Sequence, residues 1–256
     1  MHAIGISNHY IVHPFVYRSN MYRYSRFGGY STIYADSFNT AHERFEPHFQ
    51  ELQTLAHEND DIRVLRGMEA DFFQYPGWRT GFEQAIKKLQ PDYIIGSAHF
   101  IERDSDLYNM NDLKLREMPI SELVGYIEQY WQNVTLAAKS GLFDIIAHID
   151  LPKKVGIGRE DSWIESEAAA LDAIANAGCI LELNTSIYAK WNEPYPSKRI
   201  MKMAVKRNIP MIISDDAHRA KHIGRDFNEV EAWARECGAK NFVGYQKVLD
   251  FSKQRA

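Results

Sequence analysis

Short apolar runs recur along the chain, and a longer segment with helical spacing of its apolar residues follows each of them. Strands that alternate with helices in this way are typical of a parallel sheet with crossover helices. The predicted strands are Ala3–Ser7, Val64–Glu69, Tyr93–His99, Asp144–His148, Cys179–Asn184 and Met211–Asp215. The predicted helices are Glu43–Glu58, Arg79–Lys88, Ile120–Lys139, Ser166–Ala177, Ser197–Lys206 and Asn228–Glu236. The pattern predicts an α/β fold built from successive β–α units.

Helix ends and loop lengths agree with this division. Gly141 and Gly178 follow helical runs where C-terminal caps are expected, and Ser197 begins a run after Pro196. The longest predicted loops are Tyr10–Thr40 and Ile101–Pro119, and long loops on one face commonly bind ligands. A lid over a substrate and a packed loop both remain open for the aromatic and basic stretch Tyr17, Arg18, Tyr22, Arg23, Tyr24, Arg26 and Phe27.

Composition narrows the class of protein. The chain has 256 residues, of which 45% are hydrophobic and 25% charged, so we expect one globular domain over residues 1–256. A net charge of -4 and the absence of basic runs argue against nucleic-acid or membrane partners and favour a small molecule. Cys179 and Cys237 stand far apart in sequence, which predicts reduced thiols. With no signal segment or apolar span, we expect a cytoplasmic location.

Residues able to bind metal stand at the ends of the predicted strands. They are His9, Glu69, His99, His148, Asn184, Asp216 and His218. Because the carboxyl ends of parallel barrel strands meet at one mouth, we expect these side chains to converge. Imidazole with carboxylate suits zinc, manganese or iron, and paired ions promote phosphoryl transfer to water. The alternative is that these polar residues only solvate the mouth.

Six motifs carry a family resemblance: GISNH, GMEAD, GSAHF, AHIDLPKK, ELNTS and SDDAHR. In this order they resemble the PHP superfamily of metal-dependent phosphoesterases. AHIDLPKK, YPSKRI and the IGRDF that follows SDDAHR are most similar to the histidinol-phosphatase branch. The resemblance implies a distorted TIM-like (β/α)7 barrel, up to three divalent metal ions, and hydrolysis of histidinol phosphate in histidine biosynthesis. Two alternatives remain: hydrolysis of another small phosphate ester, and metal or ligand binding without turnover.

The resemblance also implies residue roles. The metal ligands would be His9, Glu69, His99, His148, Asp216 and His218, with Glu69 as the bridging carboxylate. As catalytic residues we name Glu69, His99, Asp216 and His218. Asp216 and His218 are expected to share one extended strand end and both to face the mouth. For the substrate phosphate we name Lys153, Arg219 and Arg225, and rank Arg225 and Lys153 first.

The chain departs from the family pattern at its start. The family begins with a strand that carries an HxH motif, and no such motif precedes His9. We therefore expect a missing N-terminal segment, a barrel without its first strand–helix unit, and fewer than three ions. His13 is a candidate substitute ligand, whereas His2 precedes the strand and is not. The exposed strand edges leave a homo-oligomer with crossed strand pairing open.

Two further substitutions qualify the resemblance. Asn8 stands where the family usually has an acidic residue, and Asp215 stands where it usually has serine. Neither position is a usual direct ligand. We expect both residues to adjust the surroundings of the ligands without abolishing function.

Overall fold

The structure is a computed structural model and describes residues 2–19, 22, 33–103, 106–110, 112–156 and 163–255. Its main sheet has the order β2-β1-β3-β4-β7-β8-β9, and all of its neighbouring strands are parallel. These strands are β1 (Ala3–Val12), β2 (Tyr34–Ala35), β3 (Arg63–Asp71), β4 (Tyr93–Ser97), β7 (Ile145–Ile146), β8 (Ile180–Asn184) and β9 (Met211–Ser214). A separate antiparallel hairpin comprises β5 (Phe100–Arg103) and β6 (Asp106–Asn109). Each predicted strand is present, which confirms the α/β fold.

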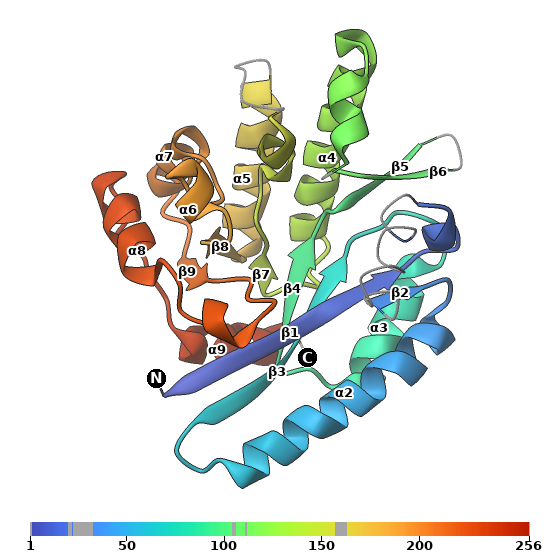
Figure 1. Cartoon of the computed structure of the whole chain (residues 1–256), viewed down its shortest axis with the longest axis vertical. Helices are drawn as coiled ribbons and strands as arrows, with labels where there is room; N and C mark the ends of the chain where they lie inside the picture. Colours follow the sequence, from blue (N-terminus) through green and yellow to red (C-terminus); the bar gives the residue numbers. More distant parts are fainter. Residues whose placement is uncertain are drawn as a thin grey trace.

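Helices surround this sheet, and the last of them along the chain lies across one end of it (Figure 1). They are α2 (Phe38–Glu58), α3 (Trp78–Leu89), α4 (Ile120–Lys139), α5 (Ile164–Ala177), α6 (Tyr188–Trp191), α7 (Lys198–Lys206), α8 (Phe227–Glu236) and α9 (Tyr245–Arg255). Short 3-10 turns are η1 (Val16–Arg18), η3 (Leu113–Glu117), η4 (Leu151–Val155) and η6 (Ala220–His222). The predicted helices are confirmed, and Gly178 caps α5 with φ of 72°. Within the described ranges, none of the helices combines the length and apolar character that a bilayer crossing requires.

The sheet is curled into an open barrel. Although β3, β4, β7 and β8 separate β1 from β9 in the sheet order, the rings of His9 on β1 and His218 after β9 lie 6.2 Å apart. β1 and β9 share no strand pairing in the described part of the chain. β2 covers the free edge of β1 only at Ile11 and Val12. The fold is thus a β/α barrel with a gap between β1 and β9.

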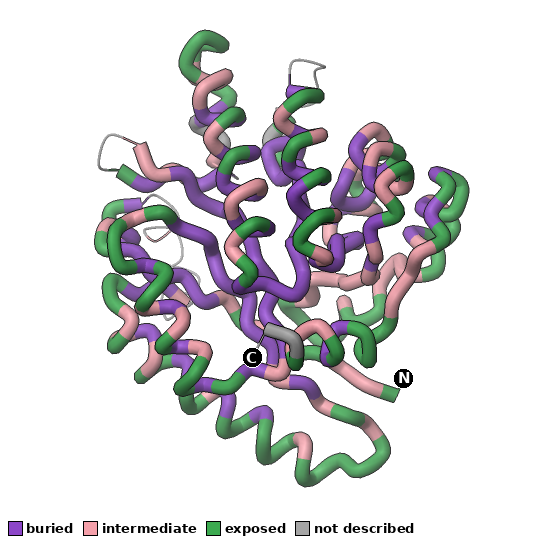
Figure 2. Tube along the Cα trace, turned by 180° about the vertical axis from the view of Figure 1, so that it is seen from behind, coloured by how far each residue is buried: buried purple, intermediate pink, exposed green. Residues whose placement is uncertain are grey.

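The two faces of the sheet form two apolar clusters. The larger one lies between the strands and the surrounding helices, and it includes Met68, Ile94 and Leu183. Figure 2 shows the middle strands of the sheet mostly buried and the outward sides of the helices exposed, whereas the first part of β1 is intermediate or exposed. The smaller cluster fills the inside of the barrel, where Leu65 and Ile95 meet Leu249 of α9. Helix α9 therefore closes the end of the barrel at which the strands begin.

The Tyr93 ring lies over two glycines inside the barrel. Its ring lies against Gly67 of β3, where an added Cβ would be 2.3 Å from Tyr93 Cζ. A Cβ at Gly5 of β1 would likewise be 2.5 Å from Tyr93 Oη. The glycines are needed here for space, since a methyl group at either position would overlap the ring. Tyr93 on β4 is the register partner of Gly67, which precedes Glu69 by two residues on β3. The Tyr93 ring therefore lies inside the barrel one layer below Glu69.

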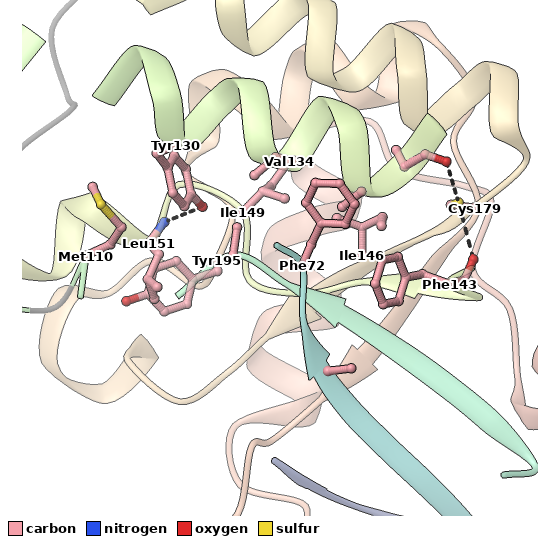
Figure 3. Close-up of a cluster of buried hydrophobic side chains, with 14 of the residues drawn as sticks. Phe72, Met110, Tyr130, Val134, Phe143, Ile146, Ile149, Leu151, Cys179 and Tyr195 are labelled. Atoms are coloured by element: carbon pink, nitrogen blue, oxygen red, sulfur yellow. Dashed lines mark hydrogen bonds between the residues drawn. The ribbon is translucent and has the colours of Figure 1, made fainter. Parts of the chain in front are cut away.

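The outer cluster also fixes the segment that follows β7. The Leu151 backbone N–H donates a 3.1 Å hydrogen bond to the Tyr130 hydroxyl oxygen of α4 (Figure 3). Nearby, the Cys179 thiol faces the backbone carbonyl of Phe143 at 3.5 Å. Cys179 and Cys237 are both buried and unpaired, which confirms the reading of reduced thiols. The Tyr130 bond holds the turn that begins just after His148.

Several predicted boundaries were wrong. β1 continues past Ser7 to Val12, because β3 and then β2 offer it partners, so His9 lies within the strand. The region expected to be a loop after β4 contains the β5–β6 hairpin and η3. α2 begins at Phe38, where the Ser37 hydroxyl accepts a hydrogen bond from the Thr40 N–H. β9 ends at Ser214, and Asp216 has a left-handed φ of 48°. The extended strand end predicted for Asp216 and His218 is therefore wrong.

Candidate metal centre

Glu69 lies at the centre of three imidazoles. His9 is its register partner on β1, and His9 Nδ1 lies 3.4 Å from Glu69 Oε2. Glu69 Oε1 lies 3.2 Å from His148 Nε2 and 3.6 Å from His99 Nε2. The parallel register explains the convergence, since β1, β3, β4 and β7 are successive neighbours and present these residues at the same edge. The structure therefore brings four of the predicted ligands together.

This cluster fits a divalent metal ion. His9, Glu69 and His99 offer ligand atoms that lie within 4.8 Å of one another. His9 Nδ1 is buried and, among the described residues, makes no hydrogen bond although it faces Glu69. Imidazole nitrogen with carboxylate oxygen is a donor set that zinc, manganese and iron accept. The two carboxylate oxygens face different imidazoles, so Glu69 has the arrangement expected of a bridging ligand.

Charge within the cluster follows from burial and proximity. Burial alone would raise the pKa of the Glu69 carboxyl, but His9, His148 and His99 together hold it well below its usual range. Burial opposes a charge on His148, yet its hydrogen bond to Glu69 raises the pKa of His148 to about 9. Burial is the main reason that the pKa of His9 is lowered. The Glu69 carboxylate is thus negatively charged, and positive charge on a neighbouring imidazole stabilises it.

Asp216 and His218 lie at the rim of the cluster. The Asp216 side chain is 29% exposed and the His218 side chain 54%. His218 Nδ1 lies 3.0 Å from the backbone carbonyl of Asp216, so this ring nitrogen faces its own loop. The ring nevertheless approaches His9, with centroids 6.2 Å apart. These two predicted ligands are therefore near Glu69 and its three imidazoles but belong to an exposed turn.

Asp215 holds that turn together. Its carboxylate accepts hydrogen bonds from the backbone N–H groups of Ala217 and Gly224. The Arg225 guanidinium donates a 2.8 Å bond to the Asp215 carbonyl, and the Thr185 hydroxyl donates to the Arg225 carbonyl. The substitution at Asp215 thus shapes the loop that carries Asp216 and His218. The Asn8 side chain similarly accepts from the N–H of His9 at 2.9 Å.

The three cationic side chains predicted to bind the substrate phosphate differ in their surroundings. Lys153 is 1% exposed, and its ammonium lies 3.5 Å from Asp150 Oδ1 and 3.6 Å from Glu193 Oε2. A phosphate would have to compete with both carboxylates for the Lys153 ammonium. Lys153 is therefore a weaker candidate for phosphate binding than the sequence suggested. Arg219 is exposed beside His218. Arg225 follows in the same loop and has a buried Nε without a hydrogen bond in the described part of the chain.

Sequence reasoning missed two buried carboxylates that support the histidines. Asp71 bonds both the backbone N–H and the ring of His99. Glu182 accepts from the N–H of His148 at 2.6 Å and from the Ser214 hydroxyl. Each lies two residues from a strand-end residue already identified, Glu69 and Asn184, and side chains two apart share a strand face. That alternation was the signal that could have found them.

Other candidates lie outside the cluster. His13 is buried just after β1 ends, where its Nε2 lies 3.3 Å from Glu102 Oε2 and its Nδ1 accepts a hydrogen bond from the Phe15 N–H. Both ring nitrogens of His13 are thus engaged away from Glu69. His2 is exposed at the opposite end of the strand. Asn184 accepts a bond from the Ser186 N–H, which is a capping role.

The predicted lid is only partly described. Tyr17 and Tyr22 pack with ring centroids 4.6 Å apart, and Tyr22 lies against Tyr34 of β2. Arg23, Tyr24, Arg26 and Phe27 lie outside the described residues.

Known proteins resemble this chain in sequence. A probable histidinol-phosphatase of Deinococcus radiodurans is 32% identical over 206 residues, which cover 77% of this chain and 74% of the relative. A probable histidinol-phosphatase of Schizosaccharomyces pombe is 22% identical over 221 residues, which cover 80% of this chain and 70% of the relative. No protein-family model matches the chain.

Two solved structures share the fold. A putative histidinol phosphatase of Listeria monocytogenes superposes with a TM-score of 0.60 at 21% identity, over 72% of this chain and 75% of its own. The histidinol phosphate phosphatase of Lactococcus lactis, solved with zinc, L-histidinol and phosphate, superposes with a TM-score of 0.54 at 18% identity, over 76% of this chain and 74% of its own. The fold, the cluster of strand-end residues and the sequence relative that is 32% identical agree, and the chain belongs to the histidinol-phosphatase family of PHP-type phosphoesterases.

Proposed function

We propose that the chain hydrolyses histidinol phosphate to histidinol and phosphate, with divalent metal ions held at the mouth of the barrel. The main structural support for this proposal is the contact of Glu69 with His9, His99 and His148. The relative that is 32% identical bears the name of this activity, and a structural neighbour was solved with the two products. Zinc is the proposed metal because that neighbour contains it and because imidazole-rich sites suit zinc.

Glu69 and the three imidazoles around it would hold the metal. Glu69 would bridge, since its oxygens face His9 on one side and His99 and His148 on the other. Asp216 and His218 would complete the site from the rim, where their side chains are partly exposed. When bound, divalent ions lower the pKa of a coordinated water and offset the negative charge of the phosphoryl group.

The chain's own residues would bind and orient the ester. Arg219 and Arg225 lie on the loop that carries His218, so an ester phosphate at the cluster would meet guanidinium groups suited to its oxygens. Lys153 would act indirectly. Its ion pairs with Asp150 and Glu193 fix the turn that follows His148. Buried free thiols at Cys179 and Cys237 agree with the proposed cytoplasmic location.

The deciding experiment is phosphate release from a substrate panel. The purified full chain, supplied with zinc, manganese or iron, is assayed with histidinol phosphate, nucleoside monophosphates and an aryl phosphate. We expect the largest kcat/KM for histidinol phosphate and loss of activity after chelation. The Glu69→Gln variant should be inactive, while Glu83→Gln, which alters an exposed ion pair on α3, should behave as the wild type.

Two results would overturn the proposal. Equal kcat/KM for histidinol phosphate and the aryl phosphate would indicate a phosphoesterase with another substrate. Metal binding without phosphate release from any of these esters would indicate a binding protein instead.

A further inference from the structure

Asp71 contacts one residue of the cluster through two separate bonds. Its Oδ1 accepts the His99 backbone N–H at 2.7 Å, and its Oδ2 lies 3.0 Å from His99 Nδ1. The carboxylate is buried, with 1% of the residue exposed. Because both oxygens face His99, the role of Asp71 concerns that histidine.

The second bond fixes where the ring of His99 carries its proton. A carboxylate can only accept hydrogen bonds, so His99 Nδ1 must donate. In the neutral ring the other nitrogen, Nε2, then has its lone pair free. Nε2 is the nitrogen that lies 3.6 Å from Glu69 Oε1, on the side of the cluster. Asp71 thereby presents His99 to the cluster in the form that a metal ion requires.

We propose that Asp71 is a positioning residue that sets both the tautomer and the orientation of His99 for metal binding. This inference rests on the metal centre of the proposed function. Groups that hydrogen-bond to metal-binding histidines orient the ring and raise its basicity, and their loss typically weakens metal binding by about 10- to 100-fold. The bond from the His99 backbone N–H adds a second restraint, because it fixes the Asp71 carboxylate relative to the main chain of His99.

The isosteric variant Asp71→Asn tests this directly. The His99 backbone N–H needs an acceptor, so the amide oxygen should take the place of Oδ1. The amide NH2 would then face Nδ1 and donate to it. The ring proton must move to Nε2, where it blocks the metal-binding nitrogen. The size of the side chain is unchanged, so the effect comes from the direction of one hydrogen bond.

Asp144→Asn is the matched control. Asp144 is also a buried carboxylate, and it accepts a 2.7 Å bond from a backbone N–H, that of Ile94 on the neighbouring strand. It lies at the start of β7, at the opposite end of the barrel from the cluster. Loss of stability from changing a buried carboxylate to an amide should be similar in both variants, but only Asp71→Asn should alter the histidine.

Two measurements on the full chain are needed. Competition with a chromophoric chelator gives the zinc dissociation constant, which we expect to rise about 10- to 100-fold in Asp71→Asn and to change less than about threefold in Asp144→Asn. Nitrogen-15 spectra of the histidine rings, assigned with a His99→Gln variant, should place the His99 proton on Nδ1 in the wild type and on Nε2 in Asp71→Asn.

The inference is overturned if Asp71→Asn binds zinc as the wild type does, if both variants lose affinity equally, or if the wild-type His99 proton lies on Nε2. Neither measurement uses a phosphate ester. A wild type that binds zinc but releases no phosphate would therefore refute the proposed function and leave the role of Asp71 standing. If the wild type binds no zinc, the proposed metal centre fails and so does the inference.

Discussion

The two ends of the barrel interior use the same strands for opposite purposes. On β3, Leu65 faces an apolar cluster, whereas Glu69, on the same face and four residues later, faces three imidazoles. Ile95 on β4 and His99, two residues past its end, repeat this change. Ile95 and Glu69 are each 8% exposed, so burial does not separate the two ends. Polarity does, because a buried carboxylate is costly unless cations or hydrogen bonds compensate it.

From this difference we expect the end where the strands begin to contribute mainly to stability, and the end where they finish to contribute mainly to activity. Where the strands begin, α9 closes the interior with Val248 and Leu249. Where they end, the interior opens to a rim with the half-exposed His218. Substitutions at the closed end should therefore lower the free energy of unfolding, and substitutions at the open end should lower activity. This separation can be tested one residue at a time.

Glu69→Gln should have the largest effect on activity. It removes the one charge shared by His9, His99 and His148, and we expect phosphate release to fall by about 1,000-fold or more, equivalent to about 4 kcal/mol. Gln fills the same volume, so thermal unfolding followed by circular dichroism should still be cooperative. A variant that fails to fold but retains its activity per folded molecule would contradict the assignment.

Gly67→Ala should have the largest effect on stability at the closed end. The new methyl group would lie 2.3 Å from Tyr93 Cζ, so the buried ring would have to shift within the packed inner cluster. Overpacking of this kind costs about 3 kcal/mol, measurable by urea unfolding. Adding Tyr93→Leu should recover part of the loss, since the clash is with the ring. Additive destabilisation in the double variant would show that the strain lies elsewhere.

The residues of the open end were predictable where the strand alone places them. Glu69, His99 and His148 follow apolar runs, and parallel strands bring such ends together whatever the loops do. Asp216 and His218 were placed correctly at the mouth but with the wrong local geometry. Their turn depends on Asp215, whose carboxylate holds two backbone N–H groups of its own loop. Such a cap is invisible to hydrophobic periodicity.

At the closed end, sequence reasoning missed α9 altogether. Of its 11 residues only Tyr245, Val248, Leu249 and Phe251 are apolar, so its apolar pattern is short. The helix is stabilised by the interior that it covers, which is a tertiary effect. β2 was missed for a related reason, because a strand of two residues exists only through its pairing with Ile11 and Val12.

Leu249→Ala should affect stability alone. Leu249 is 8% exposed within the inner cluster, and its truncation should cost about 2 kcal/mol, since the end of the barrel can partly collapse around the smaller side chain. Zinc affinity and kcat should stay at wild-type values, because the cluster lies at the other end. Lys253→Ala, at an exposed position on the same helix, controls for the loss of a side chain from α9.

Arg219→Ala should have the smallest effect and should leave stability unchanged. Arg219 is exposed next to His218, so it would attract the ester phosphate from the rim without belonging to the buried cluster. We expect KM to rise about tenfold, or about 1.4 kcal/mol, with kcat nearly unchanged and the difference shrinking at high salt. Arg207→Ala, which breaks an exposed ion pair with Asp172 on the outer helices, should alter neither constant. A fall in kcat at unchanged KM would instead mean that Arg219 acts on the transition state, and that the chemistry of the open end extends into the exposed loop.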